Sequence, residues 1–129
     1  MTSWLTDERQ EVADLLTEAG FSGTVHVPSV PLPPLAMVLP GSPYLDEGEL
    51  FGERAMRLDI WVVAGQGDTP SLADGLDEQI AGIVQTLEGD GITVESVAQP
   101  ITWKPANGSE NLVSIISVRL LVRPPALTT

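Results

Sequence analysis

The chain contains no cysteine, and this absence excludes a disulfide framework, a thiolate zinc site and a cysteine nucleophile. Basic residues are also scarce, because six Lys and Arg stand against eighteen Asp and Glu, giving a net charge of −12. That is the wrong sign for a protein that grips nucleic acid through its phosphates. We therefore expect no cofactor, no metal and no tightly held DNA or RNA.

Long apolar runs are missing as well. No stretch approaches the roughly 18 uninterrupted apolar residues that a membrane span requires, and the first eight residues lack the basic head and apolar run of a signal peptide. The length of 129 residues fits one domain, and a share of 43% apolar residues is enough for its core. We expect a soluble protein without a membrane partner, folded as one domain over residues 1–129.

The charges are unevenly spread along the chain. Seventeen of the eighteen acids precede Ser96, whereas Lys104, Arg119 and Arg123 follow it beside only Glu110. This asymmetry makes the two ends of the chain candidates for complementary contacts between copies. The alternative is that the acids only keep the molecule soluble.

Two segments carry apolar residues at the three- and four-residue spacing of an amphipathic helix. The first covers residues 3–19 and is followed by Gly20, and the second covers residues 72–87 and is followed by a Gly-Asp-Gly turn. Glycine suits the left-handed position that ends a helix. Both patterns predict helices with one buried face.

Five segments have the alternation or the apolar content of β-strands, at residues 23–27, 35–39, 56–63, 92–97 and 112–122. Between them the sequence predicts a stiff proline connector, turns and two loops, at residues 28–34, 40–43, 44–54, 65–70 and 100–110. The last strand is apolar on both faces, so we expect it near the centre of the sheet. Residues 124–129 should form a loose tail.

These elements predict an α+β fold with the order α-β-β-β-α-β-β. Because each helix has one apolar stripe, the simplest packing places both on one face of a single mixed or antiparallel sheet of about five strands. The third strand, the second helix and the fourth strand could then form a crossover unit.

Candidate chemistry is sparse. His26 is the only histidine, and no nucleophile or orienting acid stands beside it in its predicted strand, so we interpret it as structural. The Gly65-Gln66-Gly67 turn follows a strand and precedes a helix, as phosphate-binding turns do. It lacks a third glycine in register and a following Lys-Ser or Lys-Thr pair, and Asp68 would repel phosphate, so we interpret it as a plain loop.

Carboxylates could in principle hold a hard cation. The candidates are Asp46, Glu47 and Glu49 in the acidic loop and the pair Asp74 and Glu78 on the second helix. Neither group has the alternating oxygen ligands and terminal glutamate of a calcium loop. We interpret both as solvated charge and expect no catalytic, cofactor or metal site.

Aromatic residues on predicted loops are the remaining signal, because such residues often anchor protein interfaces. Tyr44 and Phe51 flank the acidic loop, and Trp103 lies beside Lys104 in the late loop. The alternative is that each folds back to cover its own sheet. The candidate interface residues are Tyr44, Asp46, Glu47, Glu49, Phe51, Trp103, Lys104, Arg119 and Arg123.

Across nearly its full length the chain resembles the tail terminator proteins of long-tailed bacteriophages. The resemblance rests on five stretches: Glu18-Ala19-Gly20 at the end of the first helix, the proline-bounded segment 27–35, Pro40-Gly41-Ser42-Pro43-Tyr44-Leu45, Leu58-Asp59-Ile60-Trp61-Val62-Val63, and Leu76-Asp77-Glu78-Gln79-Ile80. Size and element order are also similar to those of other neck and tail-completion proteins.

The resemblance implies an α+β subunit that assembles into a hexameric ring. In that family the ring caps the finished tail tube, ends its polymerisation and offers the surface to which the head joins. It further implies that the partners are sister copies, the tail tube protein and a head or neck connector protein, with DNA only as passing cargo. The location would be the tail–neck junction of the virion, after assembly in the host cytoplasm, and no catalytic residues would be involved.

Three other interpretations stay open. The nearest is a head–tail connector or stopper in the neck. An acidic DNA mimic that occupies the basic groove of a DNA-binding enzyme is a different class, and it requires carboxylates at phosphate-like spacing on one face. An enzyme would require metal-dependent hydrolysis that depends on the loop acids.

Overall fold

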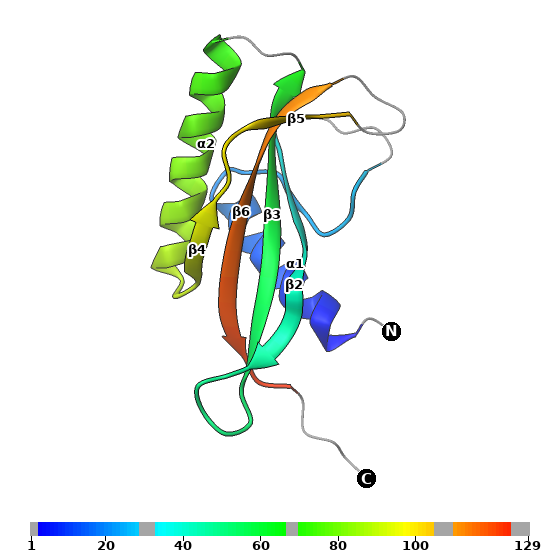
Figure 1. The fold of residues 1–129 in the computed structure, drawn as a ribbon, viewed down its shortest axis with the longest axis vertical. Helices are drawn as coiled ribbons and strands as arrows, with labels where there is room; N and C mark the ends of the chain where they lie inside the picture. Colours follow the sequence, from blue (N-terminus) through cyan, green and yellow to red (C-terminus); the bar gives the residue numbers. More distant parts are fainter. Residues whose placement is uncertain (1–2, 29–32, 67–69, 105–109, 125–129) are drawn as a thin grey trace.

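The protein folds as a six-stranded sheet with two helices on one of its faces (Figure 1). The structure is a computed structural model, and it describes residues 3–28, 33–66, 70–104 and 110–124. The elements in chain order are α1 (Trp4–Glu18), β1 (Gly23–Thr24), β2 (Leu35–Glu47), β3 (Arg54–Gln66), α2 (Pro70–Gly89), β4 (Thr93–Val97), β5 (Ile101–Trp103) and β6 (Asn111–Val122).

The strands lie in the order β1-β2-β3-β6-β4, and the short β5 pairs with the beginning of β6. Only the β1–β2 pair is parallel, so the sheet is mixed. The expected α+β class is confirmed, as is the expected element order, to which β5 adds one strand. The expected central position of the last strand is also confirmed, since β6 lies between β3 on one side and β4 and β5 on the other.

Helix α1 begins where its sequence signals predict. The Ser3 side chain accepts a hydrogen bond from the Thr6 amide at 3.3 Å, which satisfies one of the free amides of the first turn. The helix buries Val12, Ala13 and Leu16. Gly20, at φ 100°, turns the chain away from the helix.

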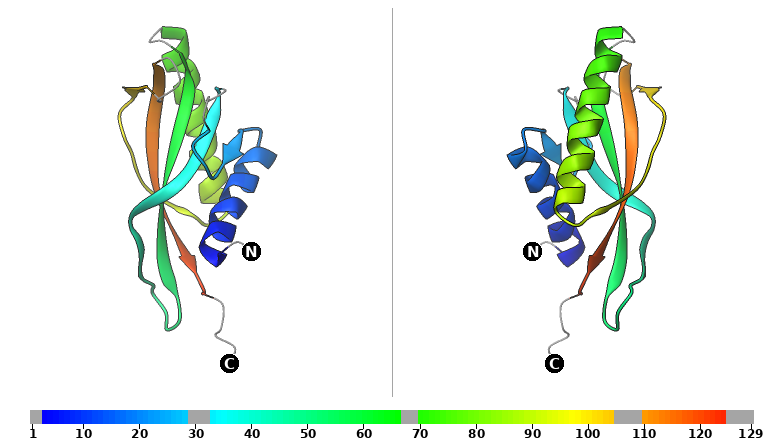
Figure 2. Two further views of the ribbon diagram at one scale, coloured as in Figure 1. Left: turned by 90° about the vertical axis from the view of Figure 1, so that its right-hand side faces the viewer. Right: turned by 90° about the vertical axis from the view of Figure 1, so that its left-hand side faces the viewer.

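Helix α2 buries Leu76, Ile83 and Leu87 against the same sheet face. Figure 2 shows both helices on one side of the sheet and the other side free of helices. The expected packing is therefore confirmed. Among the described residues no helix has the length and apolar character needed to cross a membrane.

Two contacts fix α1 to the sheet edge. The Arg9 guanidinium donates to the carbonyl oxygens of Val25 at 2.9 Å and Val38 at 3.4 Å. A Cβ at Gly23 would collide with the carbonyl of Ala13, so β1 approaches the helix more closely than any other residue at that position would permit.

The core has two parts, one on each face of the sheet. Under the helices, β3 and β6 supply a continuous apolar row at Met56, Leu58, Ile60, Ile116 and Val118, all fully buried. On the opposite face a smaller cluster forms. The two parts follow from the alternation of side chains along strands that are buried on both faces.

The prediction of a turn at residues 40–43 followed by an exposed loop at 44–54 is wrong. Strand β2 continues to Glu47 and pairs with β3 from Arg54 onward. The prolines and glycine lie in a bulge, where the register shifts between Pro40 and Leu45, and a Cβ on Gly41 would stand 2.9 Å from the Arg57 backbone. Only residues 48–53 remain as the loop of a long hairpin.

Two smaller predictions also change. The first strand pairs only over Gly23–Thr24, and β5 forms inside the expected loop at 100–110. Parts of four predicted segments lie outside the described residues: the proline connector, the turn at 65–70, that late loop and the tail at 124–129.

The fully buried Leu58 provides a test of the main core. We expect Leu58→Ala to lower the free energy of unfolding by about 2–5 kcal/mol, because it leaves a cavity between sheet and helices. Leu121→Ala removes the same atoms from a side chain that is 42% exposed and should change stability by about 0.5 kcal/mol or less. Urea titration followed by circular dichroism measures both, and equal losses would contradict the assignment of Leu58 to the core.

Candidate protein-docking surfaces

The β2–β3 hairpin extends beyond the helices and ends in residues 48–53, which we call the hairpin tip (Figure 1). Its backbone is held by hydrogen bonds from the Gly48 amide to the Glu53 carbonyl at 3.2 Å and from the Glu53 amide to the Leu50 carbonyl at 3.0 Å. Gly52 takes φ 85°, a left-handed conformation that favours glycine. The tip therefore has a defined shape at the end of a paired arm.

Two large apolar side chains stand in solvent at the hairpin tip. Phe51 is fully exposed and Leu50 is 62% exposed. Exposed aromatic side chains on a shaped loop are typical anchors of protein interfaces. Phe51 was a candidate from the sequence, whereas Leu50 was not, because a single leucine in an acidic stretch carries no periodic signal.

Ion pairs join the hairpin tip to the end of β6. Arg119 lies 3.7 Å from Glu49, and Arg123 lies 3.5 Å from Glu53. Two of the three late basic residues, Arg119 and Arg123, thus have acidic partners within their own chain. At these distances, and with one exposed member each, such pairs contribute little stability.

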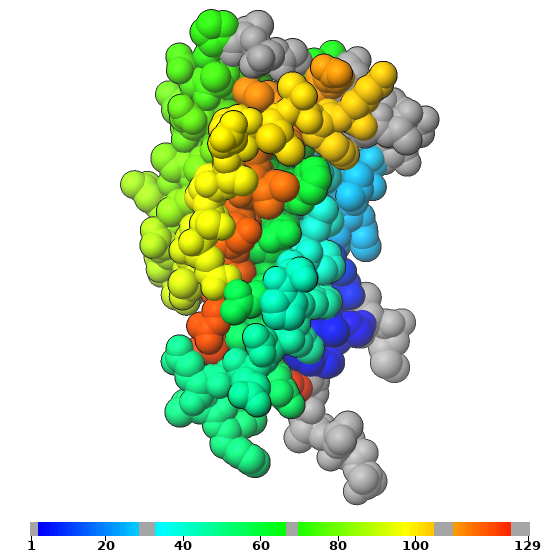
Figure 3. Space-filling model, in the orientation of Figure 1, coloured from blue at the N-terminus to red at the C-terminus, as the bar shows by residue number. Residues whose placement is uncertain are grey.

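The sheet face without helices carries a second apolar surface, which we call the aromatic patch. It consists of Leu39, Trp61, Trp103 and Ile101, and it lies over the buried cluster of Leu35, Met37, Val63 and Val113. The Trp61 and Trp103 rings meet edge to face, with centroids 5.8 Å apart. Figure 3 views this face, where residues of β5, in gold, lie near its upper end.

Polar residues occupy the same face farther toward the hairpin. Arg57 donates to both carboxylate oxygens of Glu95, at 2.9 and 3.1 Å, and Ser117 donates to Asp59 at 3.2 Å. These groups line a hollow of about 310 Å³. Arg57 and Glu95 neutralise each other, so of these four residues only Asp59 adds to the net charge.

The structure separates the other sequence candidates. Tyr44 is half-buried and packs against the main core, so for this residue the alternative of covering its own sheet holds. Trp103 does the same in part, because it packs on Trp61 while keeping a half-exposed surface. Asp46, Glu47 and Lys104 are exposed, and none of the three has an ion pair with another described residue.

The helical layer differs sharply in charge from the opposite face. The two helices hold nine of the eighteen acids and only one of the six basic residues, Arg9. Every one of these nine acids except Glu8 is exposed. The rest of the chain holds the other nine acids and the other five basic residues, so its net charge is −4, against −8 for the two helices.

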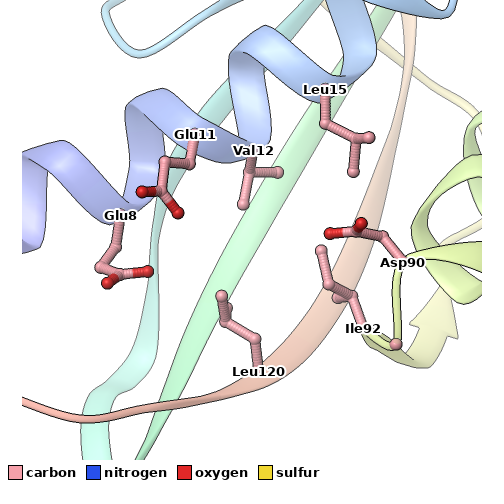
Figure 4. A pocket seen from close by; sticks show the side chains of 8 residues that line it. Glu8, Glu11, Val12, Leu15, Asp90, Ile92 and Leu120 are labelled. Atoms are coloured by element: carbon pink, nitrogen blue, oxygen red, sulfur yellow. The ribbon is translucent and has the colours of Figure 1, made fainter.

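A small cavity of about 140 Å³ lies between α1, the α2–β4 turn and β6. The carboxylates of Glu8, Glu11 and Asp90 border it, above a floor that includes Ile92 and Leu120 (Figure 4). Partial burial, followed by the charges of Glu11 and Asp7, raises the pKa of Glu8 above its ordinary value of 4.5. The groove thus concentrates negative charge on the helical side.

Catalytic geometry does not emerge from the described residues. His26 is exposed, and its amide donates to the Thr24 hydroxyl oxygen at 3.4 Å. No three histidine or acidic side chains of the described ranges converge as metal ligands would.

The raised pKa of Glu8 has a defined effect on stability. The folded state holds the Glu8 proton more tightly than the unfolded state, so ionisation costs stability as the pH rises through 4.5 toward the higher folded pKa. We expect Glu8→Gln to be more stable than the natural protein at pH 7, with the difference shrinking below pH 4. Glu18→Gln at the far end of α1 is the control, and a Glu8→Gln protein that is less stable at pH 7 in urea titrations would contradict this account.

Comparison with known proteins assigns no family to the chain. No protein-family model matches it, and no curated protein matches it. A functional assignment therefore depends on the hairpin tip, the aromatic patch and the acidic helical layer, together with the resemblance carried by the sequence.

Proposed function

We propose that the protein is a structural subunit of a phage tail that forms a ring, caps the tail tube, ends tube polymerisation and presents the surface for head attachment. The observation that carries this proposal is the presence of two exposed apolar surfaces, the hairpin tip and the aromatic patch, at opposite ends of one sheet. A subunit with two different docking surfaces can contact two neighbours at once. Its work is docking, without catalysis, at the tail–neck junction of the virion after assembly in the host cytoplasm.

Symmetry supports a ring over a simple dimer. A closed ring uses a heterologous contact, in which one patch meets a different patch on the next copy. The hairpin tip and the aromatic patch differ in shape and neighbouring charge, as such a contact requires. The resemblance to tail terminators supports six copies, with the tail tube protein and a head or neck connector protein as further partners.

The acidic helical layer fits a channel through which DNA passes. Exposed carboxylates repel phosphates and prevent the DNA from adhering to the wall. DNA is then cargo and not a ligand. The same layer also favours a second candidate, an acidic DNA mimic, because its carboxylates gather on one side of the molecule.

Tube assembly tests the main proposal. We expect purified tail tube protein, polymerising in the presence of this protein, to give shorter tubes with an added ring of density at one end, as seen by electron microscopy. Leu50→Ser combined with Phe51→Ser should lose this effect, because the variant lacks the exposed apolar pair. Val27→Ser, which alters a 52% exposed side chain elsewhere, is the matched control.

Tubes of unchanged length with bare ends would overturn the terminator role. Density on the connector side of the neck, with no effect on tube length, would favour the connector or stopper role. Both outcomes can be read from the same images.

A charge-neutral variant separates the channel from the DNA mimic. Asp77 and Glu78 lie one turn after Asp74 on α2, and all three are exposed. For a channel, Asp74→Asn, Asp77→Asn and Glu78→Gln together should leave ring assembly intact and increase DNA retention in a filter-binding assay. For a mimic, the natural protein should bind a basic DNA-binding enzyme in a salt-sensitive manner, and the triple variant should lose that binding, with Glu18→Gln as the control in both assays.

A further inference from the structure

We propose that the hairpin tip of one copy docks on the aromatic patch of a second copy, in a head-to-tail contact that repeats from subunit to subunit. The inference deepens the proposed ring function and rests on it for the closure of the ring. It names the two surfaces that meet and the residues that carry each. Leu50 and Phe51 form one side, and Trp61, Trp103 and Ile101 form the other.

The two surfaces cannot meet within one chain. The aromatic patch lies beside Val113, where β5 pairs with β6, whereas the hairpin tip lies beyond Val122 at the other end of that strand. Nine residues of extended strand separate these points by about 30 Å. The views in Figures 1 and 2 agree that β5 and the hairpin tip are at opposite ends of the sheet.

The chemistry of the two surfaces is complementary. Phe51 is fully exposed on the tip, and the patch offers two partly buried tryptophans, Trp61 and Trp103, with Ile101, which is 47% exposed. Aromatic rings prefer edge-to-face and offset contacts of the kind that Trp61 and Trp103 already make. A third ring from the tip extends this arrangement and removes apolar surface from water on both copies.

Charge selects this pairing over the alternatives. Asp46 and Glu47 adjoin the hairpin tip without an ion pair among the described residues, and Lys104 adjoins the patch in the same condition. When the hairpin tip of one copy docks on the aromatic patch of another, these opposite charges come together. When two hairpin tips meet, like charges face each other. Docking on the helical layer would place the acidic tip against nine carboxylates.

Engineered cysteines test the contact cleanly, because the natural chain has none. Leu50→Cys and Ile101→Cys each replace an exposed side chain, so both variants should fold. Mixed under mild oxidation, they should give a mixed disulfide in several-fold excess over either homodimer. Gln85→Cys, at an exposed position of α2, replaces Ile101→Cys in the control mixture and should give no excess.

A double variant tests the head-to-tail geometry. A chain that carries both Leu50→Cys and Ile101→Cys has one reactive residue at each docking surface, so oxidation should give a ladder of linked oligomers on non-reducing gels. Adding Lys104→Glu to the Ile101→Cys chain should lower the mixed-disulfide yield several-fold. Asp46→Lys on the Leu50→Cys chain should restore it, because the charges are then exchanged.

Equal cross-linking of Leu50→Cys to Ile101→Cys and to Gln85→Cys would overturn the inference, as would homodimers in excess. These results are independent of tube capping. Capping without the mixed disulfide would support the terminator function and contradict this contact. The mixed disulfide without capping would support the contact and contradict the terminator function.

Discussion

The pairing of β3 with β6 is the contact on which the positions of all other elements depend. The two strands run antiparallel from the Arg54–Val122 pair to the Gln66–Asn111 pair, with one register shift between Val63 and Gly65. Each also pairs with another strand on its outer side, β2 in one case and β4 and β5 in the other. A slip by one residue would move Arg57, Asp59 and Trp61 under the helices and expel Leu58 and Ile60. The burial of those two side chains therefore fixes the register.

The length of this strand pair also sets the distance between the aromatic patch and the hairpin tip. At one end β6 begins beside β5, which brings Trp103 onto Trp61. At the other end β6 supplies Arg119, and Arg123 follows its last residue, so both reach the acids of the hairpin tip. The helices cover the middle of one face and not the hairpin, so the same pairing that builds the core also carries an apolar tip into solvent (Figure 1). The β3–β6 pair thus supports both the buried core and the exposed hairpin tip.

Sequence patterns predicted the parts of the fold that repeat with a period. Both helices and the strand at 56–63 were recognisable because their apolar residues follow the spacing of one buried face, and the strand at 112–122 because it is a long apolar run. The hairpin was missed because local signals oppose it: Pro40 and Pro43 indicate a turn, and four acids indicate a loop. Cross-strand pairing with β3 overrides those signals, and the prolines are tolerated in the bulge of a strand that β1 covers only at Ala36 and Met37. Strand β5 was missed for a similar reason, since three residues are too few to show a period.

Some candidate docking residues could be predicted from the local sequence, whereas others depend on contacts between distant segments. Composition and loop position pointed to Phe51 and Trp103, but only the fold distinguishes the fully exposed Phe51 from Tyr44, which packs on its own core. Trp61 belongs to the aromatic patch through its contact with Trp103, which is distant in sequence, and no local pattern distinguishes the exposed Leu50 from other leucines. The ion pairs of Arg119 and Arg123 likewise depend on strand pairing across some seventy residues.

The charges are divided differently in the folded protein than along the sequence. Along the sequence the acids precede the bases, but in the fold the division runs between layers, with nine acids and one base in the helices and most basic residues in or beside the sheet. Two helical layers brought into contact would oppose many like charges at short range, where water and salt screen them least. Two sheet sides would not, because Arg57, Arg119 and Arg123 already neutralise acids there. Two thirds of the net charge of −12 thus lies in the helices, whereas the exposed apolar side chains of Leu50, Phe51 and Ile101 belong to the hairpin and the sheet.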